Sequence, residues 1–200
     1  MSNIPVYWKT RLDEVEETLK LVKKGVVTQP YSSAGGRPIY MVEYGKSTLP
    51  ARTANCSSAL GARKIECYAD KTSPDYTPCI FLCGCVHGGE FEGTSAMLNL
   101  IRLIETGTDY RGEPNDEIVE LCSKVHLILV PMVNPDGVIL SQTGSLPESA
   151  WRVYYDDLAQ GFAGANIPDY AAVWKANANG IDLNRNFPAQ WEGISVHRTA

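Results

Sequence analysis

The residues that say most about the architecture of this chain form an apolar run, Cys79-Ile80-Phe81-Leu82-Cys83-Gly84-Cys85-Val86, which ends in the polar sequence His87-Gly88-Gly89-Glu90. A strand that is apolar on both faces is typical of a sheet centre covered by helices, so we expect this run to be a buried central strand. A second run of the same kind spans Val125–Val133 and ends in Asn134-Pro135-Asp136-Gly137. The sequence therefore predicts two buried strands, each followed directly by a polar turn.

Three helices are predicted around these strands. The first has apolar residues at helical spacing, begins at a capping box of Thr10 and Asp13, and stops at Gly25. The other two lie between the apolar runs, over Glu90–Glu105 and Asn115–Lys124. Strand, helix and strand in this order indicate an α/β layer fold with a largely parallel centre.

Shorter patterns complete the expected architecture. Two strands, Pro38–Tyr44 and Lys64–Ala69, are expected to be antiparallel and to lie near the sheet edge. The stretch Ser141–Asn179 is expected to pass over the site, with a short helix near Pro168–Lys175. Gly180–Pro188 is expected to be a short strand that runs into a polar loop. We therefore predict one partial α/β domain over residues 1–200, with a mixed, centrally parallel sheet flanked by helices.

Composition and charge exclude several classes of protein. The formal net charge is −5, and the longest Lys/Arg run is Lys23-Lys24, which argues against a surface for nucleic acid or anionic lipid. No apolar stretch approaches the length of a membrane span. Residues 1–24 carry charges throughout and lack the apolar block of a signal peptide, so we expect a cytoplasmic protein. The sequence does not indicate an oligomeric state.

The six cysteines lie mostly within or beside apolar runs, which favours reduced thiols in the core over a disulfide framework. Cys83-Gly84-Cys85 is the one pair in which both sulfurs invite a metal-binding interpretation, because sulfur is a zinc ligand. Alternate residues of a strand point to the same side, so both thiols could face one zinc ion. However, no second pair of cysteines is present to complete a tetrahedral set of ligands. Core packing is therefore the default interpretation of this pair.

The two polar turns lie where α/β proteins carry their sites, at the carboxyl ends of central strands. In the first turn, His87 and Glu90 offer an imidazole nitrogen and a carboxylate, both of which are zinc ligands. Their glycine neighbours allow the backbone to approach whatever is bound. A His-x-x-Glu spacing also arises by chance, so a loop histidine beside a helix-initiating glutamate, without any metal, remains an alternative.

A further polar motif is Asp182-Leu183-Asn184-Arg185. It supplies groups that could orient a metal ligand or bind a substrate. Asp182 is a candidate partner for the far nitrogen of His87, because metal-bound histidines usually donate that N–H to a carboxylate. The planar fork of Arg185 and the amide of Asn184 are suited to hold a free carboxylate. The alternative is a surface loop with an ordinary Asp–Arg ion pair.

Three ordered motifs in this sequence resemble those of the zinc carboxypeptidase family of metallopeptidases. They are His87-Gly88-Gly89-Glu90, Pro131-Met132-Val133-Asn134-Pro135-Asp136-Gly137 and Gly180-Ile181-Asp182-Leu183-Asn184-Arg185-Asn186-Phe187. Gly36–Tyr40 is similar to the first strand of that family, and Trp174-Lys175-Ala176-Asn177 resembles its bacterial branch, which includes cell-wall peptide hydrolases. The resemblance runs from about residue 10 to residue 192.

The resemblance implies a role for each residue of these motifs. His87 and Glu90 would be ligands of Zn²⁺, and Asp182 would orient His87. Asn184 and Arg185 would bind the carboxylate of the substrate residue beyond the scissile bond.

The position of the family's oxyanion-stabilising arginine falls on Lys175, with Arg152 as a rival. A lysine supplies a point charge without a bidentate fork, so this role is the least well matched of the set.

Three further elements of the family have no convincing counterpart here: a third zinc-binding histidine, a substrate-capping tyrosine and a glutamate that acts as general base. His197 lies in a polar stretch without a strand pattern, and His126 begins a buried strand and is interpreted as structural. The tyrosines at 154, 155 and 170 precede the Asn-Arg pair, in the wrong order for the cap. We therefore expect the third ligand beyond Ala200, and a chain that is incomplete on its C-terminal side and inactive alone.

The expected function is that of a zinc-dependent peptidase acting next to a residue with a free carboxylate. The substrate is either a peptide with an ordinary C-terminal amino acid or a D,L-peptide derived from peptidoglycan, and the similarity at Trp174–Asn177 favours the second. Two alternatives stay open. One is a non-catalytic module that binds a peptide carboxylate through Asn184 and Arg185, and the other is an unrelated α/β protein in which these motifs are structural.

Overall fold

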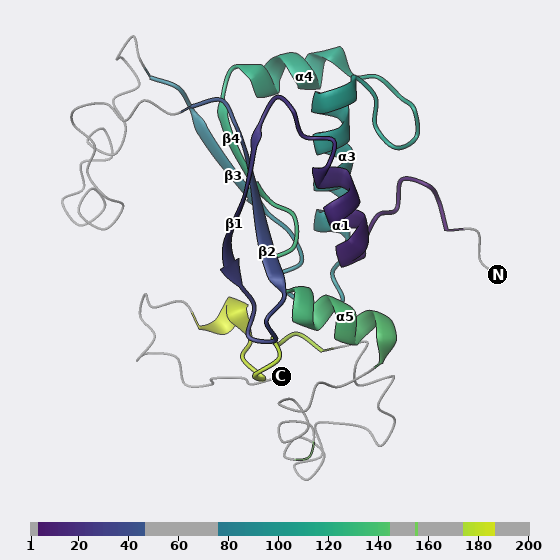
Figure 1. The fold of residues 1–200 in the computed structure, drawn as a ribbon, viewed down its shortest axis with the longest axis vertical. Coiled ribbons are helices and arrows are strands. Elements are labelled where there is room, and N and C mark those ends of the chain that lie inside the picture. The colour runs from purple at the N-terminus through teal and green to yellow at the C-terminus, as the bar shows by residue number, and fades with distance from the viewer. Residues whose placement is uncertain (1–3, 47–75, 145–154, 156–173, 187–200) are drawn as a thin grey trace.

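The computed structural model of the protein describes residues 4–46, 76–144, 155 and 174–186. In chain order the elements are α1 (Leu12–Leu19), β1 (Val26–Ser32), β2 (Pro38–Tyr44), β3 (Cys79–Cys83), α3 (Glu92–Thr106), α4 (Asp116–Ser123), β4 (His126–Val130), α5 (Pro135–Thr143) and the 3₁₀ helix η2 (Leu183–Arg185) (Figure 1). The strand expected at 64–69 lies outside the described residues. So does the helix expected at 168–175, apart from Trp174 and Lys175, which are not helical.

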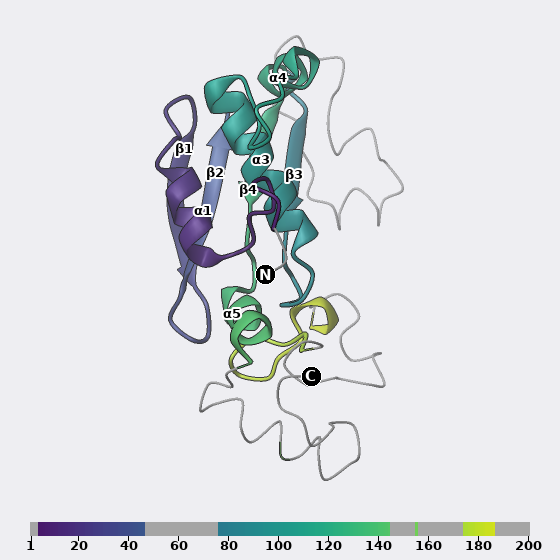
Figure 2. The same cartoon turned by 90° about the vertical axis from the view of Figure 1, so that its right-hand side faces the viewer.

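The sheet is mixed, as expected, with a parallel pair at one side. Its four strands lie in the order β1-β2-β4-β3. β3 and β4 are parallel, in register from Cys79 opposite His126 to Cys83 opposite Val130, whereas β2 is antiparallel to both β1 and β4. Helices α1 and α3 lie against one face of this sheet, and α5 lies at the end where β4 finishes (Figures 1 and 2). The α/β class predicted from the sequence is confirmed.

The hydrophobic core lies between the sheet and the two helices on its face. Along β4, Leu127 and Leu129 point into the core, and their neighbours at 126, 128 and 130 are only partly buried, as the alternation of a strand requires. Val42 of β2 lies directly opposite Leu129, and both are fully buried. The helices contribute the remaining core side chains, chiefly Val15, Leu19, Met97, Leu98, Ile101 and Ile104.

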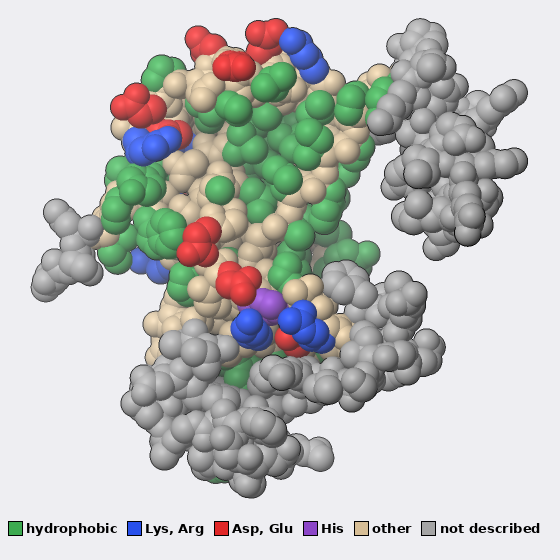
Figure 3. Space-filling model, turned by 180° about the vertical axis from the view of Figure 1, so that it is seen from behind, with side chains coloured by type: hydrophobic (Ala, Val, Ile, Leu, Met, Phe, Trp, Pro, Cys, Tyr) green, Lys and Arg blue, Asp and Glu red, His purple; other side chains and the backbone are tan. Residues whose placement is uncertain are grey.

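The predicted burial of β3 on both faces is wrong for the described residues. All five residues of β3 are exposed, and Phe81 retains 59% of its accessible surface. Within the described ranges β3 is the last strand of the sheet, so only one of its edges is paired. Figure 3 shows the resulting gathering of hydrophobic side chains on the surface seen from behind. An apolar sequence shows that a strand can be buried, but burial also needs elements that cover it.

β2 agrees with its prediction. It has the predicted bounds, is antiparallel to both neighbours and lies near the sheet edge, with one strand outside it. The edge is formed by β1, which was not among the strands predicted from the sequence and which contains Pro30. Proline is tolerated at an edge, where its missing N–H leaves no ladder bond unmade. The pairing of β1 with β2 shifts register between Thr28 and Tyr31, on either side of this proline.

The helices follow the predicted order, but the ends of α1 and α3 differ from the prediction. α4 matches its predicted bounds, with Asn115 as the N-cap. α3 begins at Glu92, so Glu90 lies in the turn before the helix and does not open it. α5 was not predicted, because its first residues were interpreted only as a turn. Asn134 caps it and Pro135 occupies its first turn, where a missing N–H costs nothing.

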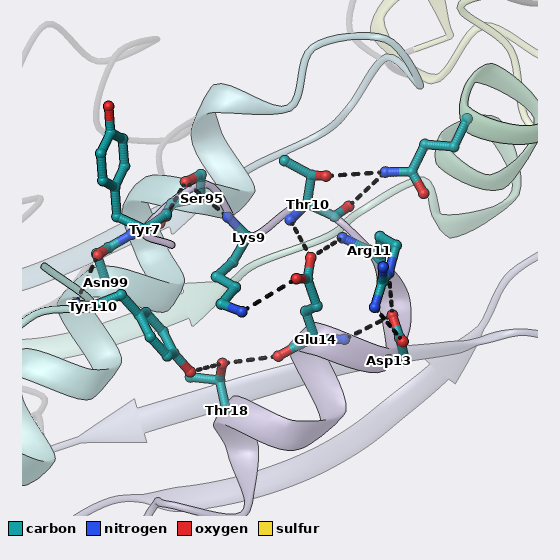
Figure 4. A network of polar contacts seen from close by, with 11 residues as sticks. Tyr7, Lys9, Thr10, Arg11, Asp13, Glu14, Thr18, Ser95, Asn99 and Tyr110 are labelled. Atoms are coloured by element: carbon teal, nitrogen blue, oxygen red, sulfur yellow. Dashed lines mark hydrogen bonds and ion pairs between the residues drawn. The ribbon is translucent and has the colours of Figure 1, made fainter. Parts of the chain in front are cut away.

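The start of α1 is capped by a residue other than the predicted pair. The Glu14 carboxylate accepts hydrogen bonds from the backbone N–H groups of Thr10 and Arg11, at 2.9 and 3.1 Å, and pairs with Lys9 at 3.3 Å (Figure 4). The capping box expected from Thr10 and Asp13 is therefore replaced by Glu14, and the helix ends at Leu19, well before Gly25. In the part of the chain that the structure describes, no helix has the length and apolarity of a membrane span.

Candidate active site

The imidazole of His87 lies between two carboxylates. One belongs to Glu90 in the same turn, and the other belongs to Asp182 in a distant part of the chain. His87 follows β3 in a short turn and is only 6% exposed. Its Nδ1 lies 2.9 Å from Oε1 of Glu90, and its Nε2 lies 3.2 Å from Oδ1 of Asp182, which is 95 residues away in the sequence. The structure thus brings together the three residues that the sequence named as the centre of a site. On the face seen in Figure 3, acidic and basic side chains gather near the lower end of the described surface.

Glycine is required at position 88 because the turn that carries His87 packs directly on the start of α5. A Cβ atom at Gly88 would lie 2.2 Å from the backbone carbonyl of Gly137, far inside van der Waals contact. The first two polar motifs, separate in sequence, are therefore in backbone-to-backbone contact at the end of the sheet.

Cys85 precedes His87 by two residues and contacts the backbone of Glu90. Its backbone is left-handed, with φ of 50°, a conformation that non-glycine residues rarely adopt. Its buried Sγ lies 3.0 Å from the carbonyl of Glu90 and 3.1 Å from the hydroxyl of Thr94, which also donates to the carbonyl of Pro131 at 2.5 Å. Burial raises the pKa of the Cys85 thiol, so this sulfur serves the structure as a neutral group.

The cysteine prediction is only partly correct. The four cysteines in the described ranges are free, as expected, but Cys79 and Cys83 are exposed, Cys122 is half-buried and Cys85 alone is in the core.

Asn134 joins the turn of His87 to the segment that carries Asp182. Its side-chain nitrogen donates to the carbonyl oxygens of Val86 (3.3 Å), Lys175 (3.3 Å) and Ala176 (2.9 Å). Its side-chain oxygen accepts the N–H of Gly137 at 3.0 Å. Asn134 is 1% exposed, so these bonds replace all of its contacts with water. The sequence identified the motif of Asn134 but not this bridging role.

Asp136 makes a second buried junction two residues further on. Its carboxylate forms an ion pair with Arg37 at 2.7 Å and accepts hydrogen bonds from the Ser33 hydroxyl at 2.7 Å and the Gly35 N–H at 2.9 Å. It also accepts the N–H of Ala178 at 3.3 Å. One carboxylate therefore fastens both the β1–β2 turn and the Asp182 segment to the start of α5. Because it is 3% exposed, this charge depends on these partners.

The segment from Trp174 to Asn186 is a series of turns rather than the expected strand. Asn177 accepts the N–H groups of Asn179 and Ile181 at 2.9 and 3.1 Å, and η2 follows at Leu183–Arg185. Asp182 caps η2, since its Oδ1 accepts the N–H of Asn184 at 2.9 Å. This is the same oxygen that faces His87, so one atom connects the imidazole to the backbone of the Asn-Arg pair.

The remaining predicted site residues lie on this segment or outside the described ranges. Asn184 and Arg185 are exposed, and the guanidinium of Arg185 donates to the carbonyl of Asn184 at 3.1 Å. Lys175 is also exposed, with its backbone carbonyl held by Asn134. His197 and Arg152 lie outside the described residues.

The donor chemistry around His87 fits part of a zinc site. An imidazole nitrogen and a carboxylate oxygen, 2.9 Å apart and at the same side of the ring, are both zinc ligands. Asp182 lies at the opposite nitrogen, where a group that orients a metal-binding histidine is found. Over residues 4–46, 76–144, 155 and 174–186, no three His, Cys, Asp or Glu side chains gather to hold one metal ion.

Comparisons with known proteins match nearly the whole chain to one family model, described as zinc carboxypeptidase, over residues 17–199. The gamma-D-glutamyl-L-diamino acid endopeptidase 1 of Lysinibacillus sphaericus is 43% identical over 75 residues, which are 36% of this chain and 17% of that protein. The human carboxypeptidase N catalytic chain is 35% identical over 105 residues, which are 52% of this chain and 18% of that protein. The chain thus spans less than a fifth of the length of these relatives.

Solved structures show the same fold at low sequence identity. The carboxypeptidase A of Helicoverpa armigera matches 99% of this chain and 38% of its own, with a TM-score of 0.53 and 18% identity. A metallo-carboxypeptidase of Burkholderia cenocepacia matches 96% of this chain and 36% of its own, with a TM-score of 0.51 and 15% identity.

Proposed function

Because this chain belongs to the zinc carboxypeptidase family, we propose that it forms part of a zinc-dependent peptidase that cleaves a peptide bond next to a residue with a free carboxylate. The observation that carries this proposal is the placement of His87 between Glu90 and Asp182, with the Asn-Arg pair connected to the same Asp182 oxygen. The proposed metal ligand His87 and the carboxylate-binding pair Asn184–Arg185 would then be held at a fixed distance from each other. A short substrate that contacts both requires such an arrangement.

The contacts of His87 indicate how its ring would bind the metal. The carboxylates of Glu90 and Asp182 only accept hydrogen bonds, so each favours a hydrogen on the ring nitrogen that it faces. If Nδ1 binds the metal together with Glu90, Asp182 would hold the ring hydrogen on Nε2. The lone pair of Nδ1 then points to the side on which Glu90 lies. His87 and Glu90 would hold Zn²⁺, which when bound polarises the scissile carbonyl and activates water as a nucleophile.

The exposed polar groups of the Asp182 segment would select the substrate. Arg185 offers a planar fork and Asn184 an amide, which together match a free carboxylate. Lys175 is the proposed oxyanion-stabilising charge, with the weaker geometry of a single ammonium. The third zinc ligand and the general base have no assigned residue in this chain.

We further propose that the substrate is a D,L-peptide derived from peptidoglycan. This is supported by the similarity to an endopeptidase whose name specifies a γ-D-glutamyl-L-diamino acid bond, at higher identity than the similarity to the human carboxypeptidase. A peptide with an ordinary C-terminal amino acid is the second candidate.

Zinc binding tests the metal part of the proposal. We expect the chain to retain zinc after dialysis against a weak chelator, and the variants His87→Ala and Glu90→Gln to lose it, because each removes one of only two assigned ligands. Metal content is measured by atomic emission. Glu113→Gln, an exposed acid in the loop between α3 and α4, is the matched control. Zinc content unchanged in both ligand variants would refute the site.

Carboxylate recognition tests the clamp. We expect γ-D-glutamyl-L-lysine to bind more tightly than its C-terminal amide, and Arg185→Ala to remove about tenfold of this preference or more, because a charge-assisted bidentate pair is lost. Binding is measured by calorimetry, with Arg11→Ala, an exposed arginine on the N-terminal side of α1, as control. Carboxylate preference without any zinc binding would favour the alternative of a non-catalytic carboxylate-binding module.

A further inference from the structure

Three chemically active side chains form a line across β3, β4 and β2, at the opposite end of these strands from His87. The Sγ of Cys79 lies 3.6 Å from Nδ1 of His126, and Nε2 of His126 lies 3.2 Å from Oε2 of Glu43. Cys79 is exposed, whereas the His126 side chain is only 13% exposed. This Cys-His-Glu line shares no residue with the candidate active site.

The register of the sheet explains why these side chains meet. Cys79 is the direct partner of His126 in the parallel pair, and Glu43 is paired with Ile128, which lies two residues from His126 on the same strand face. Leu127 points into the core beneath α1 and α3, so His126 must point to the other face of the sheet. The line therefore lies on the face away from these two helices, and solvent reaches its cysteine.

The two neighbours of His126 determine what its ring can do. The Glu43 carboxylate only accepts hydrogen bonds, so the hydrogen of a neutral imidazole is favoured on Nε2. Nδ1 is then left with its lone pair directed at the thiol of Cys79. A nucleophile, a base in contact with it and a carboxylate that orients the base are the arrangement by which proteins activate thiols.

We propose that Cys79 is a reactive thiol and a site of covalent modification by low-molecular-weight disulfides. The proton of Cys79 passes to Nδ1 of His126, and the thiolate attacks one sulfur of the disulfide. A new S–S bond forms at Cys79 while the disulfide S–S bond breaks, and the departing thiolate takes the proton from His126. The products are one mixed disulfide and one free thiol, so atoms and electrons balance.

Other cysteines of the same chain serve as internal comparisons. Cys83 is exposed and lies on the same strand and the same face as Cys79, but its cross-strand partner is the apolar Val130. Cys85 is buried and Cys122 is half-buried, and burial raises the pKa of both thiols. Exposure alone therefore predicts equal reaction at Cys79 and Cys83, whereas activation by His126 predicts faster reaction at Cys79.

The test is limited reaction of the full chain with 5,5′-dithiobis(2-nitrobenzoate), followed by quenching and mass spectrometry of each cysteine peptide. We expect Cys79 to react about tenfold faster than Cys83 or more, as is typical of thiols beside a base. His126→Gln and Glu43→Gln should each slow Cys79 and leave Cys83 unchanged, with Glu113→Gln as control. Equal rates at Cys79 and Cys83, or a Cys79 rate that neither variant changes, would overturn the proposal. Glu43→Gln retains this test if His126→Gln fails to fold, because Glu43 is partly exposed.

Discussion

Asn134 shows how much of the candidate site depends on one amide. Its nitrogen contacts three backbone carbonyls from two segments, and its oxygen caps α5. Aspartate keeps the shape and the capping oxygen but replaces the donor by a charge that faces carbonyl oxygens. Position 134 therefore requires the N–H donors of an amide side chain, which the isosteric aspartate lacks.

We predict that Asn134→Asp lowers the free energy of unfolding by about 3 kcal/mol, because buried carbonyls lose their donor and an unpaired charge is buried. Urea denaturation measures this change. Asn115→Asp is the matched control, since Asn115 is an exposed N-cap, where aspartate caps equally well. Similar losses in the two variants would show that Asn134 acts only as a helix cap.

At the scale of elements, a network of polar contacts holds the first turn of α1. Glu14 accepts two backbone N–H groups and pairs with Lys9 (Figure 4). Gln142 of α5 donates to the carbonyl of Thr10 at 3.0 Å. Burial alone would raise the pKa of Glu14, but the hydrogen bonds from Arg11 and Thr10 and the Lys9 charge outweigh it and lower the pKa.

We predict that Glu14→Ala destabilises the protein by about 1 to 2 kcal/mol at neutral pH, through loss of the cap. A carboxyl whose pKa is lower in the folded state stabilises folding above its unfolded value of 4.5, and this contribution is lost as pH falls through the folded pKa. The difference between the variant and the original chain should therefore shrink below about pH 4, as measured by urea denaturation across pH.

The control is Glu17→Ala, which removes an exposed acid of the same helix whose ion pair with Lys20 is mostly solvated. It should change stability little at any pH. A Glu14→Ala effect that stays constant down to pH 3 would contradict the assigned role of the carboxylate.

At the scale of the whole molecule, the described residues form a sheet with α1 and α3 on one face and an exposed apolar strand at one side. β3 leads into the turn of His87, so a fully exposed strand adjoins the candidate site. The same residues include His87 and Glu90, the two proposed zinc ligands, whereas a catalytic zinc site typically has three protein ligands.

We predict that residues 1–200, loaded with zinc, do not hydrolyse γ-D-glutamyl-L-lysine or a peptide with an ordinary C-terminal residue at a measurable rate. Our proposal assigns only two zinc ligands and no general base to this chain. Two ligands hold zinc less firmly than three, and catalysis without a general base forfeits a factor of about 10² to 10⁴. Release of the free amino acid is measured by chromatography. Hydrolysis that His87→Ala abolishes would show that other residues of this chain complete the site.

Local patterns in the sequence were enough to predict several parts of the protein. They predicted the bounds of β2 and α4, the order of strands and helices around the parallel pair, and the position of the polar turns at strand ends. The chemistry of metal-bound histidines and the resemblance of motifs both indicated Asp182 as the partner of His87. These features depend on periodicity, capping residues and motif order, all of which are written in neighbouring residues.

Tertiary structure alone decided the rest. It left the apolar β3 exposed, made β1 the edge strand, and assigned Asn134 and Asp136 to junctions between segments about 40 to 100 residues apart. It also aligned Cys79, His126 and Glu43 across three strands. The physical reason is that burial and long-range hydrogen bonds depend on which surfaces meet in three dimensions, whereas local sequence determines only which surfaces are available to meet.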